Sequence, residues 1–395
     1  MNPLFLEAVP LLEKLELEGY EAYFVGGSVR DSMLGRVISD IDIATSATPL
    51  ELKEIFSKTV DIGIMHGTIL VIYNGKPYEV TTFRMEGTYS DGRRPDRVEF
   101  IRSLQEDLMR RDFTMNAMAM DKTGNIIDPF HGQLSIRQKM ITSVGNPDER
   151  FGEDALRMLR AIRFSSQLGF EIEEKTYAAL KSSGPLLSSV AVERKAAEFE
   201  KLLGGPFRSK AIMLLTGAGI HNFLPGLQGK ETALYKLSEC ESEIPVEGVW
   251  VLLLHALNST GKEAEMFLKQ WRLPSKKIKS ILRVLVLLKF RLKSEWDKIS
   301  IYHAGFEFSI LTEVVFDSLT GDGDSGKVQA IYSNLPIKKR AELDITGEDL
   351  LLWREQTPGA WVKELLAEIE ARIVKGNLEN EKSAIKEWLI SCKLI

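Results

Sequence analysis

GGSVRDSMLGRVISDIDIATSA, residues 26–47, is the segment that constrains this 395-residue chain most strongly. A short apolar run at residues 22–25 predicts a buried strand that ends at Gly26 and Gly27, and a helix carrying Arg30 is expected to follow. Glycine lets a backbone approach a phosphate closely, and the free amides at the start of a helix bind anions. The segment therefore predicts a phosphate-binding turn between a strand and a helix.

Two aspartates, Asp40 and Asp42, follow the predicted helix with one residue between them. Residues i and i+2 of a strand share a face, so both carboxylates are expected to project together, with Ile41 and Ile43 turned to the core. Like charges this close repel unless a cation lies between them, and Mg²⁺ prefers oxygen ligands that substrate phosphates can complete. Asp40 and Asp42 are therefore the predicted catalytic metal ligands of a two-metal phosphoryl or nucleotidyl transfer.

A third acid, Glu79, lies in the apolar run at residues 78–83. Asn74 and Gly75 separate this run from another at residues 69–73, and Asn-Gly between two apolar runs is a strong signal for a β-hairpin. Glu79 could support the metals or deprotonate an attacking hydroxyl. The alternative, an ordinary exposed strand glutamate, stays open.

Two further motifs contain charged residues that could bind the same kind of substrate. Residues 110–117, RRDFTMNA, offer Arg111 and Asp112 to read phosphate and sugar hydroxyls, although such a pattern is also common on surfaces. Residues 153–164, EDALRMLRAIRF, repeat charge at every third position, which places neighbouring members side by side on a helix. An acid and an arginine one turn apart form a donor and acceptor pair that could match the edge of a base, with the later arginines facing phosphates. The repeated charges are Asp154, Arg157, Arg160 and Arg163, and a solvated, ion-paired helix face is the alternative.

Composition sets limits on the class of protein. Apolar residues make up 44% and charged residues 27%, as in soluble globular proteins, and the net charge is −5. No apolar stretch is long enough to span a membrane, and the N-terminus lacks a signal-peptide pattern, so we expect a cytoplasmic protein. Two cysteines without a CxxC pattern predict neither a disulfide framework nor structural zinc. Residues 272–298 hold nine basic residues against two acids and could bind an RNA backbone, although a solvated helix face explains them equally well.

The four principal motifs, in this order, resemble one family: the bacterial class II tRNA nucleotidyltransferases, or CCA-adding enzymes, of the DNA polymerase beta superfamily. These motifs are GGSVRD with DID at residues 26–43, a flexible loop at residues 89–95, RRDFTMNA and EDALRMLRAIRF. Shorter matches, VERK at 192–195, KLLGGPF at 201–207 and LENEK at 378–382, extend the similarity over nearly the whole chain. The length is similar to that of the shorter Bacillus-type members.

The resemblance implies an α+β chain with a polymerase-beta-like nucleotidyltransferase head, a small mixed sheet with helices, followed by an elongated all-α neck, body and tail. The expected boundaries are 1–138 for the catalytic head, 139–205 for the neck with its nucleotide-selecting helix, 206–300 for the body and 301–395 for a tRNA-binding tail.

The resemblance also implies the reaction: template-independent addition and repair of the 3′-terminal CCA of tRNA from CTP and ATP, with release of pyrophosphate. Asp40 and Asp42 would hold Mg²⁺, and Asp154 with Arg157 would select the base. The remaining nucleotide-binding residues would be Gly27, Arg30, Arg111, Asp112, Arg160 and Arg163. The acceptor arm and elbow of tRNA, and a second copy of the chain in a homodimer, are the implied partners.

Three alternatives remain at this point. Within the superfamily, the chain could be an A-adding specialist or a poly(A) polymerase, although a poly(A) polymerase is expected to carry a longer basic C-terminal extension. From another class, it could be an inert RNA-binding helical scaffold. A phosphate-loop ATPase is the third, because residues 321–328, GDGDSGKV, fit that loop except for Val328, which has no hydroxyl for Mg²⁺.

Overall fold

The computed structural model describes residues 1–86, 98–240 and 242–395. These residues form two compact units: Met1–Glu239 with Gln270–Arg272, and Cys240–Lys269 with Leu273–Ile395. The predicted flexible loop at residues 89–95 lies outside the described residues. The four expected domains stay a prediction, because the two units divide the chain more coarsely.

The first unit opens with a mixed sheet whose strands, within the described residues, run in the order β3-β4-β5-β2-β1-β8-β9. β2 and β5 pair in parallel, and the other neighbours pair antiparallel. This arrangement confirms the predicted small mixed sheet. The strands are β1 (Ala22–Val25), β2 (Asp42–Thr45), β3 (Thr59–Gly63), β4 (Thr68–Tyr73), β5 (Lys76–Thr82), β8 (Ala119–Met120) and β9 (Ile126–Ile127).

The predicted hairpin is the β4–β5 pair. Asn74 and Gly75 have φ angles of 50° and 78°, so both occupy the left-handed region that a two-residue hairpin turn of the favoured twist requires. A second hairpin pairs β6 (Arg84–Glu86) with β7 (Val98–Phe100). The Asn-Gly signal therefore fixed the position of the turn correctly.

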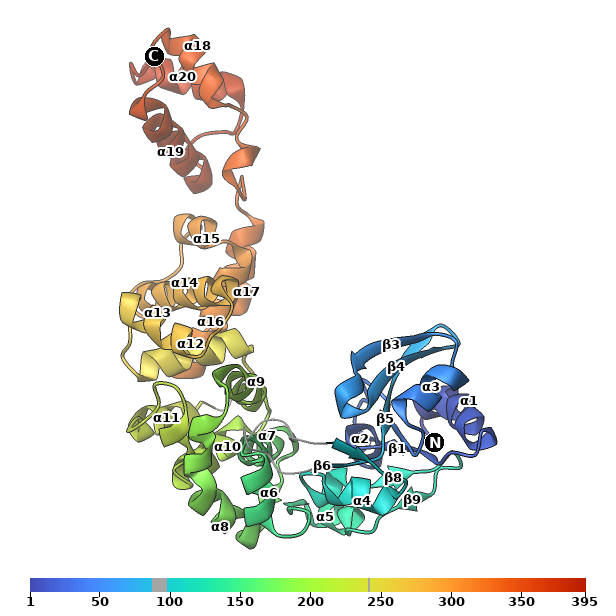
Figure 1. Cartoon of the computed structure of the whole chain (residues 1–395). Helices are drawn as coiled ribbons and strands as arrows, with labels where there is room; N and C mark the ends of the chain where they lie inside the picture. The colour runs from blue at the N-terminus through green and yellow to red at the C-terminus, as the bar shows by residue number, and fades with distance from the viewer. Residues whose placement is uncertain (87–97, 241) are drawn as a thin grey trace. The chain divides into compact units, whose positions relative to one another are not determined.

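Helices α1 (Pro3–Leu17) and α3 (Pro49–Ile55) accompany the sheet (Figure 1). Phe5 of α1 packs on Phe24 of β1, with ring centroids 4.8 Å apart. Thr48 and Glu51 form a capping box that fixes where α3 begins. The same unit contains the short helices α2 (Gly27–Met33), η1 (Ile64–His66), α4 (Leu104–Met109), η2 (Thr114–Asn116) and α5 (Gly132–Gln138).

Beyond residue 140 the first unit is almost entirely helical, as predicted. Its two remaining strands, β10 (Met140–Ile141) and β11 (Glu171–Ile172), form a short parallel pair. Helices α7 and α9 pack against each other, and α10 packs on α7 and α11. The elements are α6 (Pro147–Glu153), α7 (Leu156–Leu168), α8 (Glu174–Ser183), η3 (Gly184–Ser189), α9 (Val192–Leu203), α10 (Arg208–Gly217), η4 (Ile220–Phe223) and α11 (Glu231–Ser238).

The second unit is helical throughout the residues that the structure describes. Helices α12, α14 and α16 pack on one another, and a core around Ile301, Ile369 and Ile385 joins the last helices. Thr346 and Asp349 form a capping box at the start of α18. The elements are α12 (Val246–Ala256), α13 (Gly261–Gln270), α14 (Ser275–Arg291), α15 (Lys298–Ala304), α16 (Phe306–Thr320), α17 (Ser325–Ser333), η5 (Arg340–Glu342), α18 (Gly347–Arg354), α19 (Ala360–Lys375) and α20 (Lys382–Ser391).

The loop that matches a phosphate-loop pattern has a structural role in this unit. The Asp324 carboxylate accepts a hydrogen bond from the Lys327 amide and so caps α17. The backbone N–H of Asp324 donates in turn to the buried carboxylate of Glu313 at 2.9 Å. Lys327 forms an ion pair with Glu295 at 2.8 Å instead of pointing into an anion site.

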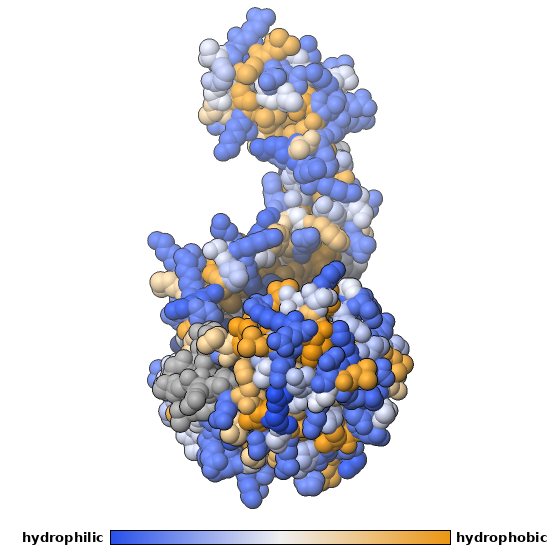
Figure 2. Space-filling model, turned by 45° about the vertical axis from the view of Figure 1, so that its right-hand side comes forward, coloured by the Kyte–Doolittle hydropathy of each residue, from blue (hydrophilic) through white to orange (hydrophobic). Residues whose placement is uncertain are grey.

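The face of the molecule in Figure 2 is mainly hydrophilic, with apolar side chains in scattered patches. Across the described ranges, no single helix has the length and apolar character needed to cross a membrane. One pair, Lys298–Ala304 with Phe306–Thr320, meets both criteria together but bends by 109°.

Candidate active site

A cavity of about 1070 Å³ lies in the first unit. Its walls come from the strands β1, β2 and β5, from α2, from the segment 110–116, and from α7 and α9. Every predicted site residue except Asp40 lines it: Gly27, Arg30, Asp42, Glu79, Arg111, Asp112, Asp154, Arg157, Arg160 and Arg163. Motifs that are more than 100 residues apart in the sequence thus share one cavity.

One wall of the cavity is acidic. The parallel pairing of β2 with β5 sets Asp42 directly opposite Glu79. The Asp42 side chain keeps contact with solvent, but partial desolvation by the surrounding walls raises its pKa, and the negative charges of Glu79 and Asp40 raise the pKa further, against the effect of Arg111. A carboxylate whose acidic neighbours outweigh the effect of a nearby arginine on its pKa is a good ligand for a cation.

Asp40 differs from the prediction. The strand begins at Asp42, so Asp40 is not part of it and does not line the cavity. Its carboxylate instead accepts a hydrogen bond of 2.9 Å from the Ser39 hydroxyl. The alternation rule for strands therefore does not apply to this pair, although the two charges are close enough for Asp40 to influence the pKa of Asp42.

The donor set fits a divalent metal ion. Among the residues that the structure describes, no three Asp, Glu, His or Cys side chains form a metal-binding group. Mg²⁺, however, is commonly held by one or two carboxylates together with substrate phosphates. Asp42 and Glu79, both hard oxygen donors on adjacent strands, meet that requirement.

The glycine turn brings the backbone close to charged side chains. Gly26 has φ of 70°, and a β-carbon there would lie 3.2 Å from Nη1 of Arg111 and 3.6 Å from Oδ2 of Asp42. A β-carbon on Gly27 would lie 3.6 Å from Nη2 of Arg30. The glycines thus leave space between a carboxylate and two guanidinium groups, where a phosphate chain has both positive charge and room.

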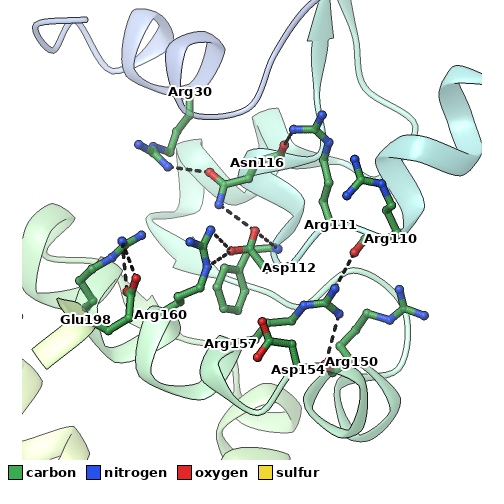
Figure 3. A network of polar contacts seen from close by, with 12 residues as sticks. Arg30, Arg110, Arg111, Asp112, Asn116, Arg150, Asp154, Arg157, Arg160 and Glu198 are labelled. Carbon is green, nitrogen blue, oxygen red and sulfur yellow. Dashed lines mark hydrogen bonds and ion pairs between the residues drawn. The ribbon is translucent and has the colours of Figure 1, made fainter. Parts of the chain in front are cut away.

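Asp112 is the centre of a polar network (Figure 3). Arg160 donates two hydrogen bonds to its Oδ2, at 2.7 and 2.5 Å, and Asn116 donates to its Oδ1 at 2.9 Å. Burial by itself would raise the pKa of Asp112, but Arg160, Asn116 and the backbone N–H of Phe113 lower it to about 2. Asn116 accepts a hydrogen bond of 2.6 Å from Arg30, so the network connects α2 to α7.

Three arginines surround the ring of Phe164. The guanidinium carbons of Arg30, Arg160 and Arg163 lie 4.9, 5.5 and 4.2 Å from its centroid. Burial, together with the neighbouring arginines, lowers the pKa of Arg163 to about 10, although Glu198 opposes this at 3.1 Å. Each of these arginines also has a carboxylate partner, Asp31, Asp112 and Glu198 respectively, and three guanidinium groups held this close together suit a polyanionic ligand.

Asp154 and Arg157 both line the cavity, but they are not paired. The predicted helix from residue 153 is broken: α6 ends at Glu153 and α7 begins at Leu156, with Asp154 in extended conformation between them. Asp154 pairs with Arg194 of α9 at 2.8 Å, and Arg157 donates to Glu153 at 2.6 Å and to the Arg110 carbonyl at 2.9 Å. Both side chains thus have partners on other elements, and Arg157 is buried, so the helix does not present a solvated face.

The cavity also contains residues that were not predicted. Arg84 precedes the loop at residues 89–95, and Arg194 and Lys201 come from α9. The VERK and KLLGGPF matches contained the last two, but nothing in those motifs indicated that they line the same cavity as Asp42. Taken over the described lining residues, nine arginines and one lysine face four aspartates and one glutamate.

A mixed sheet with paired acids beside a strongly positive cavity is the arrangement of a nucleotidyltransferase. The comparisons agree, because residues 22–142 match the poly A polymerase head domain. Residues 169–230 match a probable RNA and SrmB-binding site of polymerase A, and residues 245–389 match domain 2 of tRNA nucleotidyltransferases, described as putative.

Relatives with known names cover the whole chain. The CCA-adding enzyme of Bacillus cytotoxicus is 46% identical over 399 residues, which cover 99% of both chains. The solved structure of the Bacillus stearothermophilus CCA-adding enzyme in complex with CTP is 43% identical, with a TM-score of 0.90 over 100% of this chain and 98% of the other. The chain belongs to the family of CCA-adding enzymes.

A more distant structure shows the same fold. The Thermotoga maritima CCA-adding enzyme complexed with tRNA is 22% identical, with a TM-score of 0.65 over 99% of this chain and 96% of the other. The predicted family and the predicted fold class, a polymerase head followed by many helices, are confirmed. The inert scaffold is not supported as an alternative, because the chain is an enzyme of this family.

Proposed function

We propose that this chain adds C, C and A in turn to the 3′ end of tRNA, from CTP and ATP, and releases pyrophosphate. One observation carries the proposal: a single cavity holds paired acids on one wall, an arginine cluster beside them, and Asp154 with Arg157 at the junction of α6 and α7. These are the three parts that a polymerase without a nucleic-acid template needs. The names of the full-length relatives support it.

The acidic wall is the proposed place of reaction. Asp42 would hold Mg²⁺, and Asp40 would join it only if its side chain turned from Ser39 toward the cavity. Glu79, opposite Asp42, would be a further ligand or a base for the attacking 3′-hydroxyl. Bound metal ions would activate that hydroxyl and stabilise the charge of the departing pyrophosphate. The raised pKa of Asp42 supports this, since a cation would relieve the repulsion from Glu79 and Asp40.

The arginine cluster is the proposed triphosphate site. Arg30 and Arg111 lie beside the glycine turn, and Gly27 gives the phosphates access to the backbone. Asp112 fixes Arg160 through two hydrogen bonds, so that its guanidinium does not have to be ordered when the nucleotide binds. Arg163 completes this group.

Base selection is proposed to depend on Asp154 and Arg157. Cytosine and adenine each present an amino donor next to a ring nitrogen that accepts. Uracil and guanine present a carbonyl next to an N–H, which is the reverse pattern. A carboxylate accepts only and a guanidinium donates only, so this pair matches the first two bases and repels the others.

The helical part of the chain is the proposed tRNA-binding region, with the acceptor arm and elbow as its targets. The exposed side chains of Lys276 and Lys279 on α14 are available for phosphate contacts. A cytoplasmic location follows from the substrates, and a homodimer is the proposed assembly.

The test is an extension assay with a tRNA transcript that ends at the discriminator base, with Mg²⁺ and with CTP and ATP supplied separately and together. Growth by C, C and A that stops there supports the proposal. Addition of A only, to a tRNA that already ends in CC, would identify an A-adding specialist. Long A tails would identify a poly(A) polymerase. No extension by well-folded protein would contradict the proposed reaction altogether.

A further inference from the structure

We propose that Arg194 is a positioning residue for base selection, which holds the carboxylate of Asp154 in its accepting orientation and away from the arginines of the cavity. This inference rests on the proposed function, because it assigns a purpose to Asp154 only if Asp154 reads the base. The two are nevertheless separable by experiment.

The contacts of Asp154 come from two different elements. Oδ1 accepts a hydrogen bond of 3.0 Å from the backbone N–H of Leu156, at the start of α7, and Oδ2 accepts one of 2.8 Å from Nη2 of Arg194, on α9. Each oxygen keeps a further lone pair for a ligand. The carboxylate is thus held at both oxygens and can still accept from the amino group of a base.

The helix that carries Arg194 is itself firmly held. The next residue, Lys195, is buried, and its ammonium donates to the carbonyls of Leu187 at 3.1 Å and Phe223 at 3.4 Å. One turn after Arg194, Glu198 forms an ion pair with Arg163 at 3.1 Å. These contacts hold the backbone of α9 just after Arg194, and the ion pair of 2.8 Å with Asp154 holds its guanidinium.

The cavity contains other cations that would attract Asp154. Burial opposes the charge of Arg160, but Asp112, Glu198 and Asp154 together raise its pKa, so Asp154 is within electrostatic reach of that arginine. Arg157 also lines the cavity. If Asp154 turned toward Arg157, the acceptor and the donor of the base template would satisfy each other instead of the base. Arg194 opposes this because it supplies an ion-pair partner for Asp154 at 2.8 Å on α9.

A single nitrogen of Arg194 makes the contact. Nη1 of Arg194 has no hydrogen-bond partner among the residues that the structure describes. A lysine, which offers one ammonium group, is therefore expected to replace the interaction, whereas a methionine of similar length is not.

The experiment measures kcat/KM for CTP against UTP on a tRNA that ends at the discriminator base, and for ATP against GTP on a tRNA that ends in CC. Arg194→Met is expected to lower both preferences by about tenfold or more, the effect of losing a hydrogen bond to a charged group. Arg194→Lys is expected to restore most of the preference. Lys210→Ala is the matched control: it breaks an ion pair of 2.6 Å with Glu171 in the same unit, outside the cavity, and should leave both ratios unchanged.

A double-mutant comparison separates positioning from general damage. If Arg194 acts through Asp154, Arg194→Met should lower the base preference in the wild-type background and have no further effect in the Asp154→Asn background. Equal effects in both backgrounds, or unchanged preferences in Arg194→Met, would overturn the inference. If Asp154→Asn also leaves base preference unchanged, the proposed role of Asp154 fails first. Should Arg194→Met fail to fold, Arg194→Gln, which keeps a neutral donor, takes its place with the same expected direction.

Discussion

Replacement of Asp112 by asparagine tests the polar network that supports the arginine cluster. Asn keeps the shape of the side chain and removes the charge that Arg160 faces at 2.5 Å. The pKa of Asp112 is lowered from 3.8 to about 2, and a shift of that size corresponds to roughly 2.5 kcal/mol of folding free energy at neutral pH. Since the charge is buried, screening by water does not reduce this value much. We expect Asp112→Asn to destabilise the first unit by about 2 to 3 kcal/mol.

Hydrogen–deuterium exchange of amides in α7 and η2 reports on this unit alone. A loss of about 2 to 3 kcal/mol should accelerate the slowest amides roughly 30-fold to 150-fold. The matched control is Asp121→Asn. Asp121 also has a pKa of about 2, through hydrogen bonds from Thr123 and Asn125, but it lies in an exposed turn, so its loss should cost less than about 1 kcal/mol.

The sign of the pH dependence is fixed by the lowered pKa. Between about pH 2 and 4, Asp112 is ionised in the native state but protonated in the unfolded chain. Its contribution to the free energy of unfolding is therefore complete above about pH 4 and is lost as the pH falls toward about 2. The difference between wild type and Asp112→Asn should be constant from about pH 5 to 8. An effect of Asp112→Asn no larger than that of Asp121→Asn would refute the central role of Asp112.

Three further predictions concern the acidic wall, the glycine turn and the second unit. Asp42→Asn should abolish nucleotide addition yet raise the unfolding temperature of the ligand-free protein at pH 7. The pKa of Asp42 is raised in the native state, so ionisation of this carboxyl opposes folding. A lower unfolding temperature in calorimetry would contradict this. Gly26→Ala should lower the free energy of unfolding by about 1 to 3 kcal/mol, because the residue has φ of 70° and its β-carbon would crowd Arg111. It should also weaken CTP binding, measured by titration calorimetry. Affinity equal to that of wild type would count against the turn as a phosphate site. Glu313→Gln should lower the unfolding temperature of the second unit, because the carboxylate is buried and accepts hydrogen bonds from Arg291 and Trp296. CTP binding should stay unchanged, and a loss of CTP affinity would argue against the separation of the two units.

The parts of the fold that were predictable depend on local chemistry. Asn and Gly adopt positive φ angles more readily than other residues, so two adjacent residues, Asn74 and Gly75, are enough to predict the hairpin. The capping box at Thr346 is likewise recognisable from four consecutive residues. Such signals need no knowledge of the rest of the chain.

The break at Asp154 shows where periodicity fails. Charges at every third position favour one continuous helix, but aspartate also competes for backbone amides, and here it accepts from the Leu156 N–H and begins a new helix. Both possibilities were open in the sequence. In the structure Arg194, from another helix, holds the other oxygen of the carboxylate.

The residues that were missed depend on long-range packing. Arg194 meets Asp154 across 40 positions of sequence, and Arg84 and Lys201 reach the cavity from elements with no catalytic motif of their own. A single sequence carries no record of which helices pack together. Asp40 is the converse case. Its spacing from Asp42 in the sequence predicted that both lie on one strand, but the strand begins only at Asp42.

The parallel pairing of β2 and β5 has a consequence for how errors in this enzyme can arise. The alignment that sets Asp42 against Glu79 also sets Ile43 against Val80, and both apolar side chains are fully buried. A slip of one position in β5 would turn Glu79 toward the apolar core and Val80 toward solvent. A chain with misaligned acids would therefore bury the charge of Glu79 and expose Val80, so it would lose folding stability as well as activity. The same apolar packing that stabilises the sheet therefore keeps these two carboxylates aligned.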